Sequence, residues 1–411
     1  MSASIFKKKK KNDPSLFKII VILIAILGSA YGVFRGSRWF TEDYVSGAVE
    51  SEAPVNLDEA RGLIDQGDAV EAKKLLQPIV DRANDPSVAV PALRLMAKAN
   101  ALEGNDADAL ELLKRAATEF PASALRMEAL LDYARALEQA DQFDEAHTAY
   151  ERIRDNAPPA LRAAAFAGLG RHADRNEKKE EAVTLFRAAL ADAEWNSAAY
   201  TEALEAIGPV NVRQLFSTAK QPDAKYYEVQ SGDSLTAIGV ALNTTQGLLM
   251  RANGMDSPNK LRVGQRLKYT PKDFRIVIDI EARRIYLCDQ NGPFKLYHAG
   301  LGKPGHETVP GEYKVGSKQK DPVWYPPDGG RIEADDPRNQ LGTRWMPLVP
   351  VREGLPSDLG IHGAVDPSTV STYSSNGCAR LHMEEVEELY DLVVRSTPVF
   401  IVESATRADV T

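Results

Sequence analysis

Cysteine is scarce in this sequence: among 411 residues there are two, Cys288 and Cys378. Two cysteines are too few for the disulfide framework of a small secreted domain. A bridge between them would consume a reactive thiol, so we expect both to be free. We also expect no metal cluster and no cofactor.

An excess of basic over acidic residues is lacking as well. The net charge is −8 and the isoelectric point is about 5.5. A nucleic-acid-binding protein carries a basic surface, so we expect no nucleic-acid partner. Because one hydrophobic core rarely grows to this chain length, we expect a multidomain protein.

Long uncharged apolar runs are rare, and the clearest one is residues 19–34. As a helix it would be about 24 Å long, close to the thickness of a bilayer core. The preceding segment, 1–18, is rich in lysine, and the positive-inside rule therefore places the N-terminus in the cytoplasm. We expect a single-pass anchor in the cytoplasmic membrane, a tether over 35–55, and the remainder in the periplasm or cell wall. A cleaved signal peptide, with small residues at Gly28-Ser29-Ala30, is the alternative.

Residues 56–207 are rich in alanine and leucine at helical spacing, and a short pattern returns about every 37 residues. Each copy has an acidic residue, then alanine, then apolar residues three and four positions later. The copies start at Glu71, Asp108, Glu145 and Glu181. This all-α region resembles tetratricopeptide repeats, which stack helix pairs and present a concave surface. This region either binds a protein partner or acts as a spacer.

After a linker predicted over 208–224, residues 225–271 resemble a LysM module. The shared features are Val229-x-Ser231-Gly232-Asp233-Ser234-Leu235, then Asn253, then Leu261-x-Val263-Gly264-Gln265-x-Leu267. The pattern predicts a strand, a helix from Leu235, a second helix after Thr245, and a closing strand from Leu261. The resemblance implies a small βααβ fold that binds peptidoglycan glycans containing N-acetylglucosamine.

Residues 274–404 read as short strands, with one helix near Met383 and a last strand over 398–402. Within this region lie two glycine-flanked motifs. One is Ile361-His362-Gly363 and the other is Ser375-Asn376-Gly377-Cys378-Ala379-Arg380. A thiol near its ordinary pKa is mostly protonated at neutral pH, so a nucleophilic cysteine needs a neighbouring base. Gly377 permits a sharp turn that points backbone amides at a developing oxyanion.

These motifs resemble the catalytic domain of the L,D-transpeptidases, the YkuD family. Further shared pieces are the Pro310-Gly311 bend and Asn339-x-Leu341-Gly342-x-Arg344. The resemblance implies a β-rich domain in which Cys378 attacks a peptidoglycan tetrapeptide stem, releases D-alanine, and passes the acyl group to a second stem as a 3→3 cross-link. It implies that His362 is the base and that amides near Cys378 bind the oxyanion. It also implies that Arg380 positions the loop or a substrate carboxylate, while Ser375 and Gly363 shape the loop.

One position departs from the family pattern. Many members carry a second histidine two residues before the cysteine, where this chain has Asn376. Asparagine cannot relay a proton, which leaves His362 as the base. A hydrolase that trims stem peptides or opens cross-links, and a wall-binding scaffold without catalysis, remain the alternatives to a transpeptidase of cell-wall biogenesis.

Overall fold

The computed structural model describes residues 55–326 and 329–411. The predicted cytoplasmic segment and anchor, and the tether as far as residue 54, lie outside these ranges. Among the described residues, no helix combines the length and the apolar character that crossing a bilayer requires. The chain divides into two compact units between Gly168 and Leu169.

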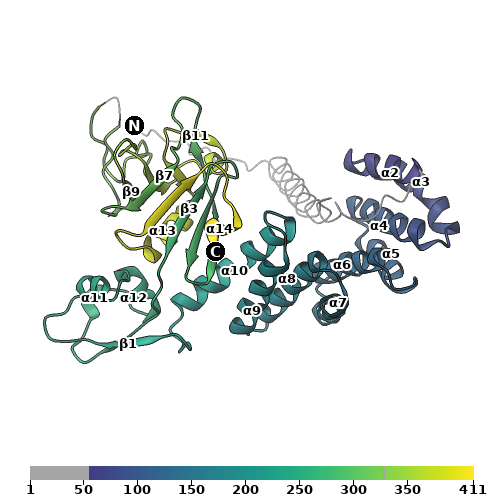
Figure 1. Ribbon diagram of the computed structural model, residues 1–411, viewed down its shortest axis with the longest axis horizontal. Helices are drawn as coiled ribbons and strands as arrows, with labels where there is room; N and C mark the ends of the chain where they lie inside the picture. Colours follow the sequence, from purple (N-terminus) through teal and green to yellow (C-terminus); the bar gives the residue numbers. More distant parts are fainter. Residues whose placement is uncertain (1–54, 327–328) are drawn as a thin grey trace, which may run out of the picture. The chain divides into compact units, whose positions relative to one another are not determined.

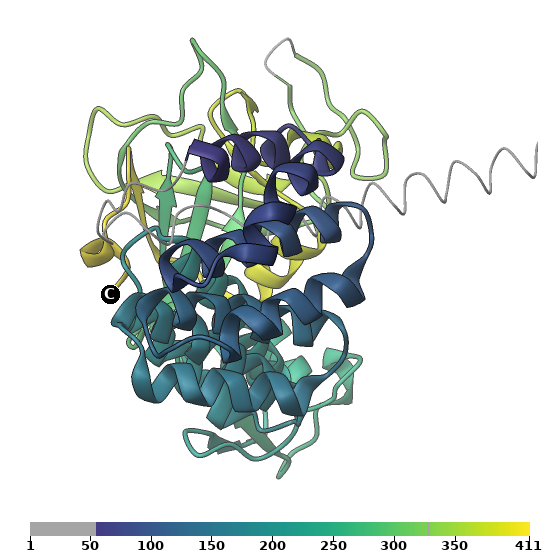
Figure 2. The same ribbon diagram turned by 90° about the vertical axis from the view of Figure 1, so that its right-hand side faces the viewer.

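The first unit is entirely helical, as the alanine-rich repeat pattern predicts. Figure 2 shows its helices, coloured purple to blue, as a stack of successive hairpins. The alanine in the second place of each repeat is buried, including Ala72, Ala109 and Ala146. A small side chain there lets neighbouring helices approach closely, which is why the pattern recurs. The helices are α2 (Val55–Asp65), α3 (Ala69–Arg82), α4 (Pro86–Leu102), α5 (Asp106–Thr118), α6 (Ala124–Gln139), α7 (Phe143–Asn156) and the first part of α8 (Pro159–Arg175).

The second unit begins with the end of α8, then α9 (Lys179–Asp192) and α10 (Ala198–Phe216). The predicted linker over 208–224 is wrong as far as Phe216, because α10 continues through Pro209. A proline inside a helix costs about 3 kcal/mol, and tertiary packing offsets that cost here. Val210 and Leu215 are buried, and the Asn211 side-chain amide donates to the Phe294 carbonyl at 2.8 Å.

A βααβ module follows, as predicted: β1 (Lys225–Glu228), α11 (Leu235–Ala241), α12 (Gln246–Ala252) and β2 (Arg266–Tyr269), with a 3-10 turn η3 (Pro258–Lys260). The two strands pair antiparallel. The expectation of a closing strand from Leu261 is wrong in its start, since β2 begins at Arg266. Residues before it form a turn in which Gly264 has φ +79°. The core contains Val229, Leu235, Ile238, Leu249 and Leu267.

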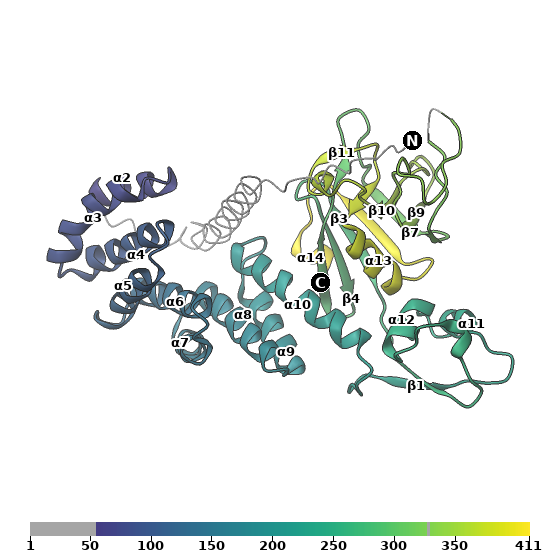
Figure 3. The ribbon, with the colours of Figure 1, turned by 180° about the vertical axis from the view of Figure 1, so that it is seen from behind.

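The C-terminal domain is built on a mixed sheet (Figure 1). Its strand order is β12-β10-β9-β7-β13-β3-β4-β5, with β8 beside β9, and a small parallel pair joins β11 to β6. Helix α13 (Met383–Leu392) lies against β10 and β9, as Figure 3 shows from behind. The strands are β3 (Arg275–Asp279), β4 (Arg284–Asp289), β5 (Gly292–His298), β6 (Leu301–Gly302), β7 (Gly311–Val315), β8 (Gln319–Lys320), β9 (Arg344–Pro350), β10 (Gly360–Gly363), β11 (Tyr373–Ser375), β12 (Ala379–Leu381) and β13 (Pro398–Val402); η4 (Pro367–Thr369) and α14 (Arg407–Val410) complete the domain.

Candidate active site

The candidate nucleophile lies at the entrance to strand β12. Cys378 directly precedes Ala379, the first residue of that strand, and its side chain is partly exposed. Its Sγ lies 3.8 Å from the Asp358 carbonyl oxygen, an acceptor that a thiol can use. Cys288, by contrast, is fully buried inside β4, where a substrate has no access to it.

The candidate base lies on the neighbouring strand. β10 runs parallel to β12, with His362 opposite Arg380. Opposed residues of a sheet share a face, and side chains two apart along a strand return to it. Continuing the register by one residue places Cys378 beside Gly360, so the thiol and the His362 imidazole share the face of Arg380. From strand spacing and rise, the two Cα atoms are roughly 8 Å apart.

The other side of His362 is closed by strand β9. Trp345 is opposite His362 in the antiparallel register, and the two ring centroids lie 5.9 Å apart. The indole also covers Gly360, where an added Cβ would lie 2.2 Å from the ring. A side chain at position 360 would therefore displace the tryptophan. His362 is 4% exposed as a result.

Backbone contacts fix the state of the imidazole. His362 Nδ1 lies 3.0 Å from the Gly363 carbonyl oxygen. A carbonyl only accepts, so Nδ1 carries the proton of the neutral ring and Nε2 keeps its lone pair. Burial lowers the pKa of His362 to about 4; the Gly363 and Gln340 carbonyls oppose this shift, and the Arg380 cation adds to it.

Burial acts on the thiol in the opposite direction. Burial raises the pKa of Cys378 to about 11, and the charge of Asp358 also raises this pKa. The Gly360 amide and the charge of Arg380 lower it by smaller amounts. Burial also lowers the pKa of Arg380, whose Nε is enclosed and has no hydrogen-bond partner among the described residues. The resting site is therefore a neutral thiol and a neutral imidazole beside one guanidinium.

A hydroxyl holds the cysteine loop in shape. Ser375 Oγ donates to the Cys378 carbonyl at 2.7 Å and accepts from the Gly377 amide at 3.1 Å. Thr308 Oγ1 donates to the Gly377 carbonyl at 2.8 Å. Gly377 has φ +107°, a backbone conformation that favours glycine. The Gly377 amide is thus engaged within the loop.

Two of the predicted site residues direct no side chain at the thiol–imidazole pair. Asn376 is exposed at the tip of the loop. Gly363 faces helix α13, where an added Cβ would lie 2.6 Å from Met383 Sδ. Among residues 55–326 and 329–411, no group of three or more histidine, cysteine, aspartate or glutamate side chains is placed to hold a metal ion.

Two segments of the chain match the models of known protein families. Residues 273–401 match the model of the YkuD family, described as the L,D-transpeptidase catalytic domain. Residues 227–270 match the LysM domain. The match to the L,D-transpeptidase catalytic domain therefore follows the match to the LysM domain almost directly in the chain.

The relatives support a peptidoglycan L,D-transpeptidase type of function. YkuD of Bacillus licheniformis, which bears the name of an L,D-transpeptidase, is 26% identical over 43% of this chain and 97% of its own length. YqjB of Bacillus subtilis, named likewise, is 28% identical over 32% of this chain and 73% of its own. A solved L,D-transpeptidase from Mycobacterium smegmatis is 18% identical, with a TM-score of 0.26, over 34% of this chain and 64% of its own. This chain therefore spans less than two thirds of that mycobacterial protein.

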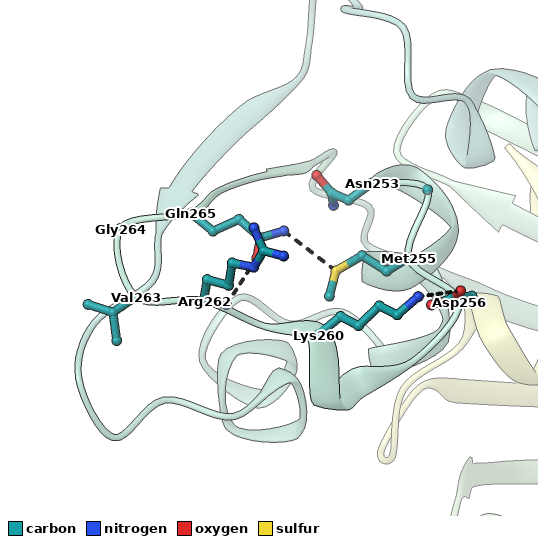
Figure 4. A pocket seen from close by; sticks show the side chains of 9 residues that line it. Asn253, Met255, Asp256, Lys260, Arg262, Val263, Gly264 and Gln265 are labelled. Atoms are coloured by element: carbon teal, nitrogen blue, oxygen red, sulfur yellow. Dashed lines mark hydrogen bonds and ion pairs between the residues drawn. The ribbon is translucent and has the colours of Figure 1, made fainter.

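The LysM domain has an open hollow of about 600 Å³ beyond the C-terminal end of α12 (Figure 4). Gln265 Nε2 points to Met255 Sδ at 3.8 Å, and Lys260 Nζ pairs with Asp256 at 2.6 Å. Val263 is 71% exposed at the rim. Asn253 bonds the backbone on both sides of its amide, to the Leu249 and Lys268 carbonyls and the Lys268 amide, so its role is to hold the module together.

Three residues that contact the site are not predicted from the sequence: Trp345, Asp358 and Thr308. None stands in a recognisable motif of the sequence, and each is brought to the site by strand register or by a loop. The Asn339 side chain, inside a predicted motif, is buried and donates to the Pro322 carbonyl at 2.8 Å. This bond fixes the loop whose Gln340 carbonyl acts on His362.

Proposed function

We propose that this protein is a peptidoglycan L,D-transpeptidase that forms 3→3 cross-links through a thioester on Cys378. The observation that carries the proposal is the parallel register of β10 and β12, which puts His362, Arg380 and the Cys378 thiol on one face. A base, a nucleophile and a fixed cation on one face are the groups that acyl transfer needs.

Acylation starts from the neutral pair. The Cys378 sulfur attacks the carbonyl carbon of the third stem residue while its proton passes to His362 Nε2, and the carbonyl π electrons move to oxygen. The C–N bond to D-alanine then breaks, the carbonyl reforms, and the imidazolium gives its proton to the departing amine. The products are a thioester and free D-alanine, with neutral His362 restored.

The pKa values set the order of these events. Between a thiol of pKa about 11 and an imidazole of pKa about 4, proton transfer at rest costs roughly 10 kcal/mol before the ions attract each other. A resting thiolate–imidazolium pair is therefore disfavoured. Deprotonation accompanies attack, when negative charge moves on to the substrate oxygen and backbone amides can bind it. Because the Gly377 amide is engaged by Ser375, the Cys378 amide is the donor we assign to the oxyanion.

Deacylation repeats the chemistry with a second stem. Its amine attacks the thioester carbon, His362 accepts a proton from that amine, and the C–S bond breaks. The thiolate recovers the proton from the imidazolium, which leaves a new amide and free enzyme. Water in place of the amine would give a shortened stem, the outcome of a carboxypeptidase.

We place the reaction at the outer side of the cytoplasmic membrane, in the periplasm or cell wall. The apolar run 19–34 after a lysine-rich start supports a single-pass anchor there. The LysM domain supports binding to peptidoglycan glycan, with its open hollow as the contact surface. The helical repeats supply a surface for a protein partner, and a role in cell-wall organisation and cell shape follows from the reaction.

The test incubates the purified protein with disaccharide-tetrapeptides and analyses the products by mass spectrometry. We expect D-alanine release and 3→3 dimers from the wild type, none from Cys378→Ala, and unchanged dimer formation from the matched control Cys288→Ala. Shortened monomers without dimers would reject transpeptidation in favour of hydrolysis. A carbapenem should leave an acyl adduct on the peptide containing Cys378; activity in Cys378→Ala would overturn the mechanism.

A further inference from the structure

The LysM domain is docked on the catalytic domain through the end of helix α13. Arg251 Nε, on α12, lies 2.8 Å from Asp391 Oδ2. Thr245, which caps the same helix, donates its hydroxyl to the Asp391 backbone carbonyl. Both the side chain and the backbone of one aspartate therefore hold the N-terminal cap and the last turn of α12.

Gly247 shows how close this contact is. A Cβ added there would lie 2.2 Å from Asp391 Oδ1 and 3.2 Å from its Cβ. Gly247 lies in the first turn of α12, where a helix on its own is better served by alanine or an acidic residue. The glycine is accounted for by the neighbouring domain, because any side chain at 247 meets Asp391.

An apolar contact continues the docking surface. Leu248, the next residue on α12, is 5% exposed and belongs to the core of the catalytic domain, together with Val212 and Leu215 of α10. The Arg251 guanidinium lies 4.6 Å from the centre of the ring of Phe216, the last residue of α10. Burial of Leu248 in this core requires the LysM domain to sit against α10 and the sheet of the catalytic domain together.

A buried cation fixes strand β2 of the module as well. Lys268, on β2, is 3% exposed, and its Nζ donates to the carbonyls of Ser217 and, at 2.9 Å, Ala219. These carbonyls belong to the segment that leaves α10. The LysM domain is thus fastened at α12 and at β2, and a freely swinging tether is not what the contacts describe.

The docking leaves the LysM hollow uncovered. The docked residues lie between Thr245 and Arg251, and none of them lines the hollow, whose lining begins at Asn253 beyond the end of α12. The rim is exposed, with Val263 at 71%. A glycan strand can therefore occupy the hollow while the domain stays docked.

We infer that this docking makes the LysM domain a fixed guide that selects stems carried on a glycan polymer over free stem peptides. The inference rests on the proposed function. A glycan held in the hollow occupies a set position relative to Cys378, so only stems at matching positions along that strand reach the thiol. A binding module in fixed geometry raises the effective concentration of the stems it aligns and lowers that of the others. Asp391, Gly247 and Arg251 are in this sense positioning residues for the polymer.

The experiment uses the full chain and two undocking variants. Gly247→Glu places a side chain and a like charge against Asp391 in a helix first turn that favours an acidic residue. Arg251→Glu reverses one charge of the ion pair at a position 46% exposed in its side chain. The matched control is Ala237→Glu, which adds the same charge at an exposed site in the first turn of α11. Each protein is assayed on soluble disaccharide-tetrapeptide and on intact sacculi, and α12 is followed by hydrogen exchange.

We expect both undocking variants to turn over the soluble substrate within about twofold of the wild type and to lose roughly tenfold on sacculi. Exchange in α12 should rise in these variants, and the control should match the wild type in all three measurements. If the variants show faster exchange in α12 but match the wild type on sacculi, the LysM domain does not guide the substrate. If exchange in α12 is unchanged in both variants, these contacts do not hold the LysM domain in place. A wild type that releases no D-alanine from either substrate would instead reject the proposed function beneath it.

Discussion

The thiol of Cys378 is expected to be a slow nucleophile in the resting protein. Its pKa is raised by burial to about 11, against an ordinary value of 9.0. At pH 7 the thiolate fraction is then about 10⁻⁴ rather than about 10⁻², so alkylation by iodoacetamide should run roughly 100-fold slower than for a free thiol of equal access. The rate should climb about tenfold per pH unit, without a plateau below pH 10.

His362 sharpens this prediction. With its own pKa lowered to about 4, it does not hold the thiol proton at rest, so His362→Ala should leave the alkylation rate within about threefold while abolishing transpeptidation. The assay is mass spectrometry of the Cys378 peptide after timed labelling between pH 6 and pH 10. Cys288, buried with a pKa raised to about 12, is the internal control and should stay unlabelled.

The reasoning would be refuted by an alkylation rate that is already constant from pH 6 upward and collapses in His362→Ala. That result would mean a preformed thiolate–imidazolium pair, in which the attraction between the ions exceeds the desolvation that opposes them both. Turnover would then begin from an ionic site, and the coupling of proton transfer to attack proposed above would be wrong.

Three further outcomes can be measured. The folded pKa of His362 lies below its unfolded value of 6.5, so the unfolded state binds more protons between pH 6.5 and pH 4. The free energy of unfolding should therefore fall by up to about 3 kcal/mol as the pH falls through that window. Measured by urea unfolding, this dependence on pH should be weaker in His362→Phe. Gly377→Ala should lower the free energy of unfolding by about 1–3 kcal/mol, because alanine is strained at φ +107°. The measurement is the urea midpoint, with Ala379→Gly as the comparison variant. Ser375→Ala removes both hydroxyl bonds of the loop and should lower kcat at least tenfold with KM nearly unchanged, whereas equal kinetics would show that the loop holds its shape without the hydroxyl.

Local patterns predicted much of this molecule. The βααβ order of the LysM domain and the strand carrying Cys288 follow from alternation and capping residues, and both are present. The continuation of α10 through Pro209 was not predictable, because its cause is packing on β5, a strand far along the chain. The same holds for the site: His362 and Cys378 stand in motifs, but Trp345 reaches them through the register of β9.

Arg380 acts on both members of the proposed catalytic pair. Its positive charge lowers the pKa of Cys378 and also lowers the pKa of His362, so it favours the thiolate and disfavours the imidazolium. A cation with these two effects does little for a resting ion pair. Its field is useful when negative charge has moved from sulfur to the substrate oxygen, since a fixed positive charge then needs no reorganisation. Asn376, exposed in the loop before the cysteine, has no part in the proposed mechanism, which moves one proton through His362 alone.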